Sequence, residues 1–304
     1  MKQRILITGG SGLLALNWTN AVRDRCSVTL GLHNRQIVVS EAQTQQIDLE
    51  SVHGLVRLLE QASTQVVIHT AGLTSVDQCE AEPELARHLN VILATNVAKA
   101  CAISGVKLVH ISTDHIFSGQ DSLVDENHRV APVNFYGLTK VQAENQVLEI
   151  NPLSLVIRTN FYGWGTSYRH SFSDTVINSL RAQTKVMLFQ DVFYTPILIE
   201  TLAKAVHDLV DLKASGIFNV VGDERISKYG FGLKIAEEFN LDSSFLIPGL
   251  IREQEVLVRR PHDMTLSNKK VCDLLGRRLG LISEHLANLH LQELTGLAQG
   301  LNSL

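Results

Sequence analysis

The N-terminal half of the chain alternates short apolar runs with longer stretches in which apolar residues recur every three or four positions. Short runs rich in Val, Ile and Leu between turn residues are typical of buried parallel strands, and the longer periodic stretches are typical of helices that cover a sheet. The predicted strands are residues 4–8, 27–32, 46–49, 65–69, 106–111 and 153–158. The predicted helices of this half are residues 13–25, 51–61 and 83–103, with another that begins near residue 133.

The C-terminal half is richer in helical patterns. Its predicted helices are residues 172–182, 198–212, 227–238, 268–275 and 283–297. Strands that alternate with helices predict an α/β fold built on a doubly wound parallel sheet of the Rossmann type. We expect residues 1–158 to form this domain, with part of about 190–215 returning to it. Residues 159–304 are then expected to form a smaller, interleaved α/β substrate domain.

A glycine-rich loop, Gly-Gly-Ser-Gly-Leu-Leu-Ala at 9–15, follows the first predicted strand and precedes a predicted helix. This is the context of a loop that binds the diphosphate of a dinucleotide, because the free N–H groups of a helix N-terminus favour an anion. Gly9 permits a tight turn, Gly12 lets the backbone approach the diphosphate, and Ala15 is small enough for close helix–strand packing. An ordinary turn with glycines is the alternative. The candidate cofactor-binding residues are Gly9, Gly10, Ser11, Gly12, Leu13 and Leu14.

The second predicted strand ends in His33-Asn34-Arg35, without the carboxylate that takes the ribose hydroxyls of NAD in such folds. A cation at this place suits the 2′-phosphate of NADP. Arg35, assisted by His33 and Asn34, therefore predicts NADP(H) as the cofactor, with NAD as the alternative. A solvated loop arginine would give the same pattern.

Two further strand ends are expected to border the cofactor. An acid ends the strand at 46–49, where it can accept from the adenine amino group, cap the next helix, or do both. Small residues follow the strand at 65–69 and let the backbone pass close to the cofactor. Asn90, within the helix predicted at 83–103, fits either polar surface or the support of an active-site water. The candidates at these ends are Asp48, Leu49, Thr70, Ala71 and Gly72.

Tyr136 and Lys140 are four residues apart on the helix that begins near residue 133, so they project from one face with Cβ atoms ~5–6 Å apart. A phenol has a pKa of ~10, and a neighbouring ammonium lowers that pKa towards the range in which proton transfer works near neutral pH. Thr113 lies just past the strand at 106–111, at the edge of the sheet where ligands bind. Tyr-x-x-x-Lys alone also fits an ordinary amphipathic helix. Together with Thr113 and the glycine loop it predicts that Thr113, Tyr136 and Lys140 converge beside the cofactor, as candidates for proton transfer.

The composition is that of a globular protein with a good core. Of 304 residues 45% are hydrophobic and 19% charged, and the formal net charge is −4 without a basic run, which does not favour a nucleic-acid partner. No apolar segment approaches the ~18 residues of a membrane span, so a soluble, cytoplasmic protein is expected. The four cysteines lack a C-x-x-C spacing and are expected to be free thiols. The twelve histidines show no metal-binding spacing, so no metal site is predicted.

These motifs have a known counterpart. The chain resembles the extended short-chain dehydrogenase/reductase superfamily, and within it the dTDP-4-dehydrorhamnose reductase (sugar-nucleotide-binding) family. The resemblance spans almost the whole chain. Besides the glycine loop it rests on Ser-Thr-Asp-His-Ile-Phe-Ser-Gly at 112–119, Tyr-Gly-Leu-Thr-Lys at 136–140, Arg-Thr-Asn-Phe-Tyr-Gly at 158–163, Tyr-Thr-Pro at 194–196, Gly-Ile-Phe-Asn-Val at 216–220, Ser-Lys-Tyr at 227–229 and Arg-Pro-His-Asp at 260–263.

The resemblance implies a role for each catalytic candidate. Tyr136 would protonate the C4 carbonyl oxygen of the sugar as hydride arrives from the nicotinamide. Lys140 would hold the nicotinamide ribose and lower the pKa of Tyr136, while Thr113 would donate to the same carbonyl oxygen. Asp114 would contact the sugar. In physical terms this is general acid catalysis with preorganised donors where the oxygen gains charge.

Two branches of the superfamily fit less well. Sugar-nucleotide 4,6-dehydratases carry an Asp-Glu pair after the threonine, whereas here Asp114 is followed by His115. The fucose-synthase branch epimerises with a cysteine and a histidine, and no cysteine follows Ser112. Both departures favour a simple reductase.

Residues beyond the edge of the sheet are candidates for substrate binding. The aromatic residues after the strand at 153–158 either stack on a base or sugar ring or seal the junction between the domains. Arg259 and Arg260 suit a diphosphate, which guanidinium groups bind in bidentate fashion, with a solvated basic turn as the alternative. The candidate set is Thr74, Asp114, His115, Asn160, Phe161, Tyr162, Trp164, Arg259 and Arg260.

The leading hypothesis is an NADPH-dependent reductase of a nucleotide-linked 4-keto-6-deoxy sugar. A reductase or epimerase of another nucleotide sugar is the alternative among enzymes. An alternative of another class is a non-catalytic NADP-binding subunit, because the methionine adenosyltransferase regulatory subunit looks similar through several of the same motifs. A homodimer is compatible with either.

Overall fold

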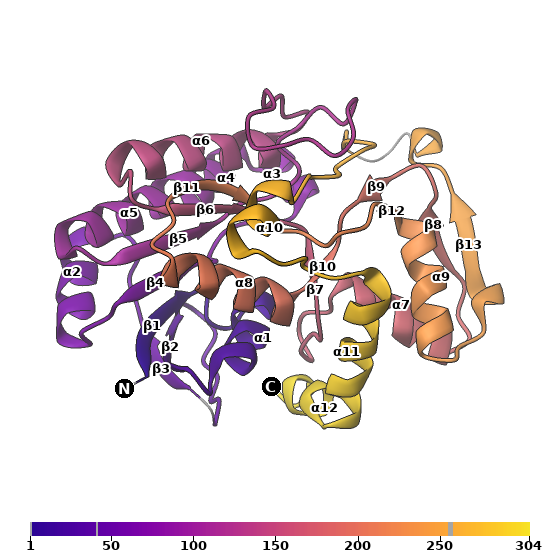
Figure 1. Ribbon diagram of the computed structural model, residues 1–304, viewed down its shortest axis with the longest axis horizontal. Helices are drawn as coiled ribbons and strands as arrows, with labels where there is room; N and C mark the ends of the chain where they lie inside the picture. The colour runs from indigo at the N-terminus through magenta and orange to yellow at the C-terminus, as the bar shows by residue number, and fades with distance from the viewer. Residues whose placement is uncertain (1, 41, 255–257) are drawn as a thin grey trace.

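A seven-stranded parallel sheet forms the centre of the larger region of the molecule (Figure 1). The computed structural model describes residues 2–40, 42–254 and 258–304. The strands are β1 Gln3–Thr8, β2 Cys26–Leu32, β3 Gln43–Gln46, β4 Val66–His69, β5 Lys107–Ile111, β6 Leu155–Arg158 and β11 Gly216–Asn219. Their order, β11-β6-β5-β4-β1-β2-β3, reverses direction at β1, which pairs with both β2 and β4. This confirms the predicted Rossmann-type α/β fold and places a ligand crevice beyond the carboxyl end of β1.

Helices cover both faces of the sheet (Figure 1). On β1, Ile5 and Ile7 point to one face and Leu6 to the other, because side chains alternate along a strand. The first face packs against α1 Leu13–Val22 and α8 Ile199–Asp211. The second face packs against α2 Val52–Gln61, α5 Leu93–Ser104 and α6 Phe135–Ile150.

Four predicted elements depart most from their expected bounds, and others differ by one or two residues. The helix expected at 83–103 is divided into α4 Pro83–Arg87, a π-helical turn His88–Ile92 and α5. The strand expected at 46–49 is β3 at Gln43–Gln46, whose four polar side chains are exposed at the sheet edge. Pairing with β2 places this strand, and no apolar pattern marks it in the sequence. The first helix ends at Val22. The last helix breaks at Gly296, with φ of +88°, into α11 Ile282–Leu294 and α12 Leu297–Asn302.

The smaller region lies beyond the carboxyl edge of the sheet (Figure 1). Its parallel pair, β8 Val186–Phe189 and β13 Leu246–Gly249, packs with α7 Phe172–Arg181 and α9 Lys228–Glu238. After β6 the chain enters this region and then returns to the large sheet as α8 and β11, so the two regions are interleaved. The remaining elements are β7 Phe161–Tyr162, β9 Phe193–Tyr194, β10 Ile197–Leu198, β12 Ile226–Ser227, α3 Val76–Ala81, α10 Lys269–Leu275 and the 3₁₀ turns Ser243–Phe245 and Ile251–Glu253.

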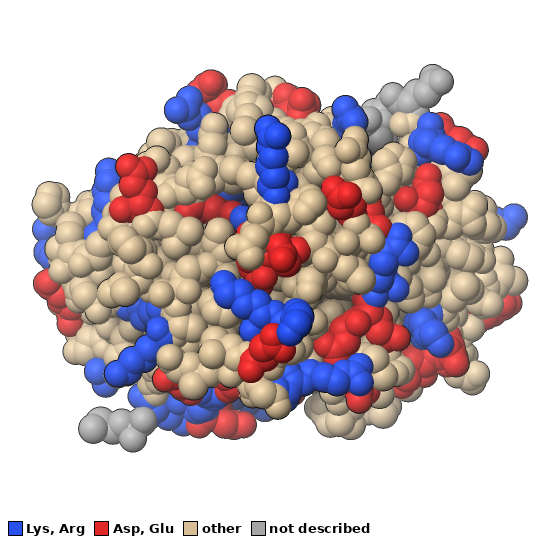
Figure 2. All heavy atoms as spheres, turned by 45° about the horizontal axis from the view of Figure 1, so that its top comes forward, with Lys and Arg blue, Asp and Glu red and all other residues tan. Residues whose placement is uncertain are grey.

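Charged side chains, cysteines, long apolar helices and possible metal ligands were each expected from the sequence to be unexceptional, and the structure can be compared with these expectations. On the face drawn in Figure 2, acidic and basic side chains are interspersed. All four cysteines are free thiols, and three of them are buried, as expected. Within the described ranges no helix is long and apolar enough to cross a bilayer. The same residues contain no cluster of three His, Cys, Asp or Glu side chains arranged for a metal ion.

Two histidines stack inside the sheet. His69 of β4 and His110 of β5 are direct neighbours in the ladder, with ring centroids 5.4 Å apart, and each is 1% exposed. The Thr8 hydroxyl lies 2.8 Å from Nδ1 of His69, whereas neither ring nitrogen of His110 has a partner among the described residues. Burial lowers the pKa of His69 to about 3 and that of His110 well below its usual value. Both imidazoles are therefore neutral at physiological pH.

Loss of stability is expected as the pH falls from about 6.5 to 5. In this window the unfolded chain protonates its histidines near their usual pKa of ~6.5, while His69 and His110 stay neutral in the fold. The free energy of unfolding should therefore fall by up to ~1.4 kcal/mol per pH unit for each buried histidine. Urea titrations at several pH values measure this slope. His110→Phe removes one buried histidine and should lower this slope by up to ~1.4 kcal/mol per pH unit. The same change at exposed His53 is the control and should leave the slope unaltered.

Candidate active site

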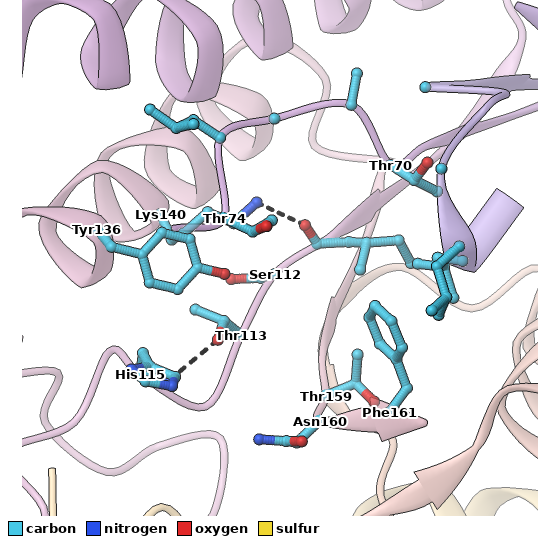
Figure 3. A pocket seen from close by; sticks show the side chains of 18 of the residues that line it. Thr70, Thr74, Ser112, Thr113, His115, Tyr136, Lys140, Thr159, Asn160 and Phe161 are labelled. Carbon is cyan, nitrogen blue, oxygen red and sulfur yellow. Dashed lines mark hydrogen bonds between the residues drawn. The ribbon is translucent and has the colours of Figure 1, made fainter. Parts of the chain in front are cut away.

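A cavity of about 520 Å³ opens at the carboxyl edge of the sheet. Its walls come from the glycine loop after β1, the segments that follow β4, β5 and β6, the helix α6, and a loop before α7. Parallel strands present their carboxyl ends at one edge, so residues far apart in the sequence meet there. Figure 3 shows the side chains that line this cavity.

The glycine loop has the geometry of an anion cradle. Gly9 has φ of +68°, and a Cβ on it would lie 3.0 Å from backbone atoms of Ala71, so a larger residue would push β1 and β4 apart. The N–H of Gly12 donates to the Gly9 carbonyl at 2.8 Å and closes the turn. Helix α1 then begins without a side-chain cap and without an acid in its first turn, so its free N–H groups favour an anion. These features fit a dinucleotide diphosphate.

Most candidates of this loop line the cavity, and Gly10 does not. Gly9, Ser11, Gly12, Leu13 and Leu14 are at its wall. The N–H of Gly10 donates to the Gly31 carbonyl at 2.9 Å, so Gly10 anchors the loop to β2. Its cofactor role was predicted because it lies within the motif, whereas its backbone faces the neighbouring strand.

The end of β2 lies outside the cavity. His33, Asn34 and Arg35 are exposed, and the guanidinium of Arg35 lies over the ring of Tyr168, 3.8 Å from its centroid. The Tyr168 hydroxyl donates to the Ser11 carbonyl at 2.7 Å. A loop of the smaller region thus holds Arg35 beside the glycine loop.

The other strand ends divide into two groups. Thr70, Ala71 and Gly72 line the cavity. Asp48 and Leu49 do not: Leu49 packs against the core under α2, and Asp48 is exposed. Asp48 also does not cap α2, because Ser51 does so by accepting from the Gly54 N–H at 3.0 Å. Asp48 instead accepts from the N–H of Glu50.

Asn90 is buried, which corrects its interpretation as polar surface. Its side chain accepts from the Leu73 N–H at 2.7 Å and donates to the Thr139 hydroxyl at 3.0 Å. Asn90 lies in the π-helical turn and lines the cavity. It therefore joins the segment after β4 to the helix that carries Tyr136 and Lys140.

Thr113, Tyr136 and Lys140 all reach one side of the cavity (Figure 3). Asn134 caps α6 by accepting from the Gly137 N–H at 2.9 Å, which fixes where the helix begins. A Cβ at Gly137 would lie 2.4 Å from the His115 carbonyl oxygen, so glycine lets α6 approach the segment that carries Thr113. Local capping and close packing thus hold the three side chains together.

The pKa of Tyr136 is raised to about 12, opposite to the direction expected from a nearby lysine. Burial is the main cause, because a phenolate loses hydration inside the protein, and the Thr113 hydroxyl opposes it. The Lys140 ammonium donates to the Ile111 carbonyl at 2.7 Å, and burial lowers its own pKa to about 8. The prediction that Lys140 lowers the Tyr136 pKa is therefore wrong for this structure. Tyr136 keeps its proton at neutral pH.

The substrate candidates near these residues are linked to one another. Asn160 donates to Oδ2 of Asp114 at 2.6 Å, and the Thr113 hydroxyl donates to Oδ1 of the same carboxylate at 3.2 Å. His115 is edge-on to Tyr136, and burial lowers its pKa. Phe161 lies across the cavity from Tyr136 and His115 (Figure 3). Thr74 is at the mouth, where it accepts from Arg169.

Tyr162 and Trp164 lie away from the cavity. Trp164 is 5% exposed, donates from its indole to the Leu289 carbonyl at 3.0 Å, and meets Phe239 edge-on. Tyr162 is 2% exposed and packs edge-on against Phe231. Neither ring is open to a base or a sugar. The alternative role, sealing the junction between the two regions, accounts for both.

The two arginines expected at a diphosphate differ in position. Arg259 is exposed and does not line the cavity that holds Tyr136. Arg260 lines a second cavity and donates to Oδ2 of Asp77 at 2.7 Å.

Tyr168 and Arg169 were not predicted from the sequence. Arg169 lines the cavity and reaches across it, donating to the Thr74 hydroxyl at 2.8 Å, while Tyr168 contacts the glycine loop. Both lie between predicted elements, and only the fold brings that loop to the cofactor edge of the sheet.

The fold and the site define a class of protein. A doubly wound parallel sheet, a glycine loop before an uncapped helix, and a tyrosine–lysine pair beside a strand-end threonine are the features of the extended short-chain dehydrogenase/reductases. Within that class, the chain belongs to the family described as the RmlD substrate binding domain, whose profile matches residues 2–293. The resemblance inferred from the sequence is thereby confirmed.

Three relatives show the breadth of the family. The probable low-salt glycan biosynthesis reductase of Haloferax volcanii is 29% identical over 287 residues, covering 93% of this chain and 96% of the relative. Methionine adenosyltransferase 2 subunit beta of Mus musculus is 30% identical over 287 residues, covering 91% and 84%. The structure of dTDP-4-dehydrorhamnose reductase from Bacillus anthracis in complex with NADP has a TM-score of 0.84 at 25% identity, covering 96% of this chain and all of that one.

Proposed function

We propose that the protein is an NADPH-dependent reductase of a nucleotide-linked 4-keto-6-deoxy sugar. The observation that carries the proposal is the meeting of a protonated Tyr136 with Thr113 and Lys140 in the cavity that the glycine loop borders. The likeness to a dTDP-4-dehydrorhamnose reductase in complex with NADP supports the same reading.

The cofactor would lie along the carboxyl edge of the sheet. The N–H groups at the start of α1 and the loop from Gly9 to Leu14 would hold its diphosphate, and Arg35 its 2′-phosphate. Thr70, Ala71 and Gly72 would line its path, and Lys140 would hold the nicotinamide ribose. When bound, NADPH supplies hydride chemistry.

Tyr136 acts as the general acid. Its raised pKa keeps the hydroxyl protonated, which is the form that a proton donor needs. The proton moves from its Oη to the C4 oxygen as that oxygen gains charge, and the Thr113 hydroxyl donates a hydrogen bond to the same atom. Lys140 donates to the Ile111 carbonyl, which fixes its ammonium at the cavity wall where the ribose would lie. Asp114 and Asn160 would orient the sugar.

Oxidation of NADPH with a panel of dTDP-, UDP-, GDP- and CDP-linked 4-keto-6-deoxy sugars tests the proposal. Turnover with at least one member is the expected result. The 30% identity to a methionine adenosyltransferase subunit favours a second candidate, a non-catalytic NADP-binding subunit. Inactivity with the whole panel, together with tight NADPH binding and co-purification of a larger enzyme, would support that second function.

Arg35→Ala is expected to raise the dissociation constant for NADPH about tenfold to a hundredfold, because one charge-assisted contact to the 2′-phosphate is lost. The constant for NADH, which lacks that phosphate, should change little. Fluorescence titration of both nucleotides measures the difference. Arg57→Ala, an exposed arginine on α2, is the matched control and should alter neither constant. Equal losses for both nucleotides with Arg35→Ala would refute the assignment.

A further inference from the structure

A second cavity of about 450 Å³ adjoins the one that holds Tyr136. Thr74, Val76, His115 and Phe172 line both cavities, so the two share a wall. The far wall is mainly apolar and comes from β8 and the segments near it. That wall includes Met187, Leu188, Phe189, Val192, Ile251 and Met264.

Two cations line this second cavity, and they differ in their partners. Arg260 is neutralised by Asp77, with its Nη2 atom 2.7 Å from the carboxylate. Lys228 has no such partner among the described residues: its Nζ lies 3.3 Å from the centroid of the Tyr194 ring and 4.8 Å from that of Phe172. Ring faces attract an ammonium but accept none of its N–H hydrogens as a carboxylate does.

The backbone holds Lys228 firmly in this position. It is the first residue of α9, after the cap Ser227, whose hydroxyl accepts from the Gly230 N–H at 3.0 Å. The N–H of Lys228 donates to the Val192 carbonyl at 3.0 Å. Burial lowers the pKa of its ammonium to about 8, and Asp114 opposes that shift. At neutral pH the group is still mostly charged.

An oxyanion of the ligand would satisfy this cation. Ring faces leave the three N–H donors of this half-buried ammonium incompletely satisfied, and an anion in the cavity would accept from them directly. Asp114 interacts with Lys228 electrostatically, but no ion pair within 4 Å joins the two side chains. The apolar wall across the cavity suits a nucleoside.

We propose that Lys228, in its cage of Tyr194 and Phe172, binds the diphosphate of the substrate. This rests on the proposed function in that the substrate carries a nucleoside diphosphate. A carboxylate on the sugar is the other source of an oxyanion at this place. Two features favour the diphosphate. Lys228 and Arg260 line the same cavity, and that cavity shares His115 with the one that holds Tyr136.

The test is nucleoside diphosphate binding by calorimetry, which needs no turnover. Lys228→Met keeps the length of the side chain and removes its charge, and it should raise the dissociation constants of dTDP or UDP and of inorganic pyrophosphate about tenfold to a hundredfold. NADPH affinity and the melting temperature should be preserved. Lys228→Arg should retain much of the binding. Lys234→Met, an exposed lysine on the same helix, is the matched control and should bind like the wild type.

Each remaining outcome has one meaning. If wild type and Lys228→Met bind the nucleoside diphosphates equally, the inference is overturned while the proposed reductase function stands. Glucuronate is the probe for a sugar carboxylate. If Lys228→Met weakens the binding of glucuronate alone, the diphosphate assignment is overturned in favour of a sugar carboxylate. If the wild type binds no nucleoside diphosphate although it oxidises NADPH with a keto sugar, the inference fails and so does the nucleotide-linked substrate class.

Discussion

Replacing Tyr136 by phenylalanine is expected to lower the turnover of a 4-keto substrate by about 10²–10⁴-fold, the usual contribution of a positioned general acid. Only the hydroxyl is lost, and the ring keeps its contacts with Val76 and Cys79. Folding and the dissociation constant of NADPH should therefore be unchanged. Single-turnover oxidation of NADPH measures the effect on the chemical step.

Two controls make this result specific. Tyr229→Phe removes a hydroxyl from a tyrosine on α9 that lines neither cavity, and it should leave turnover unchanged. Thr113→Val should also lower turnover, because it removes the second donor to the same oxygen. If Tyr136→Phe turns over substrate at the wild-type rate, Tyr136 is not the proton donor and the proposed mechanism is wrong.

Arg158→Met is expected to destabilise the protein by about 3–5 kcal/mol, the largest effect that we expect of a single substitution on stability. Arg158 and Glu144 form a bidentate ion pair, with Nε–Oε1 at 3.0 Å and Nη2–Oε2 at 2.7 Å, and their side chains are 4% and 3% exposed. The Ser112 hydroxyl donates to the same carboxylate at 2.5 Å. Removal of the cation leaves Glu144 buried without its charge partner.

Urea unfolding at neutral pH measures the loss. The double variant Glu144→Gln, Arg158→Met removes both charges and should recover part of the stability, because no charge is then buried alone. Lys269→Met breaks an exposed ion pair with Asp273, and it should change the free energy of unfolding by less than about 1 kcal/mol. A loss below about 1 kcal/mol for Arg158→Met would show that water reaches the pair.

Local patterns in the sequence were sufficient to predict the fold and to bring Thr113, Tyr136 and Lys140 to one cavity. Apolar runs at regular intervals predicted six strands, and the structure has a strand of the large sheet at or beside each of them. The glycine loop and Thr113 could be placed because each directly follows a strand, and strand ends of a parallel sheet share an edge. Tyr136 and Lys140 could be paired because four residues make about one helical turn.

Several residues had two interpretations, because the choice depends on surroundings that a local pattern does not contain. Trp164 follows a strand like a ligand-binding aromatic, yet the last long helix, α11, supplies the carbonyl that fixes its indole. Asn90 fitted either polar surface or a place at the active site, and only the packing of the segment after β4 buries it at the cavity wall. Asp48 precedes a helix, but Ser51 is the residue with the geometry of the cap.

The sequence by itself determined the class of fold, the position of the glycine loop and which candidate residues meet at the edge of the sheet, because each depends on spacing along a strand, a turn or a helix. Only the tertiary structure decided the protonation and partners of those residues. Burial raises the pKa of Tyr136, the Ile111 carbonyl holds Lys140, and Tyr194 cages Lys228. Desolvation and pairing depend on which distant segments enclose a side chain, and that is set when the two regions pack together.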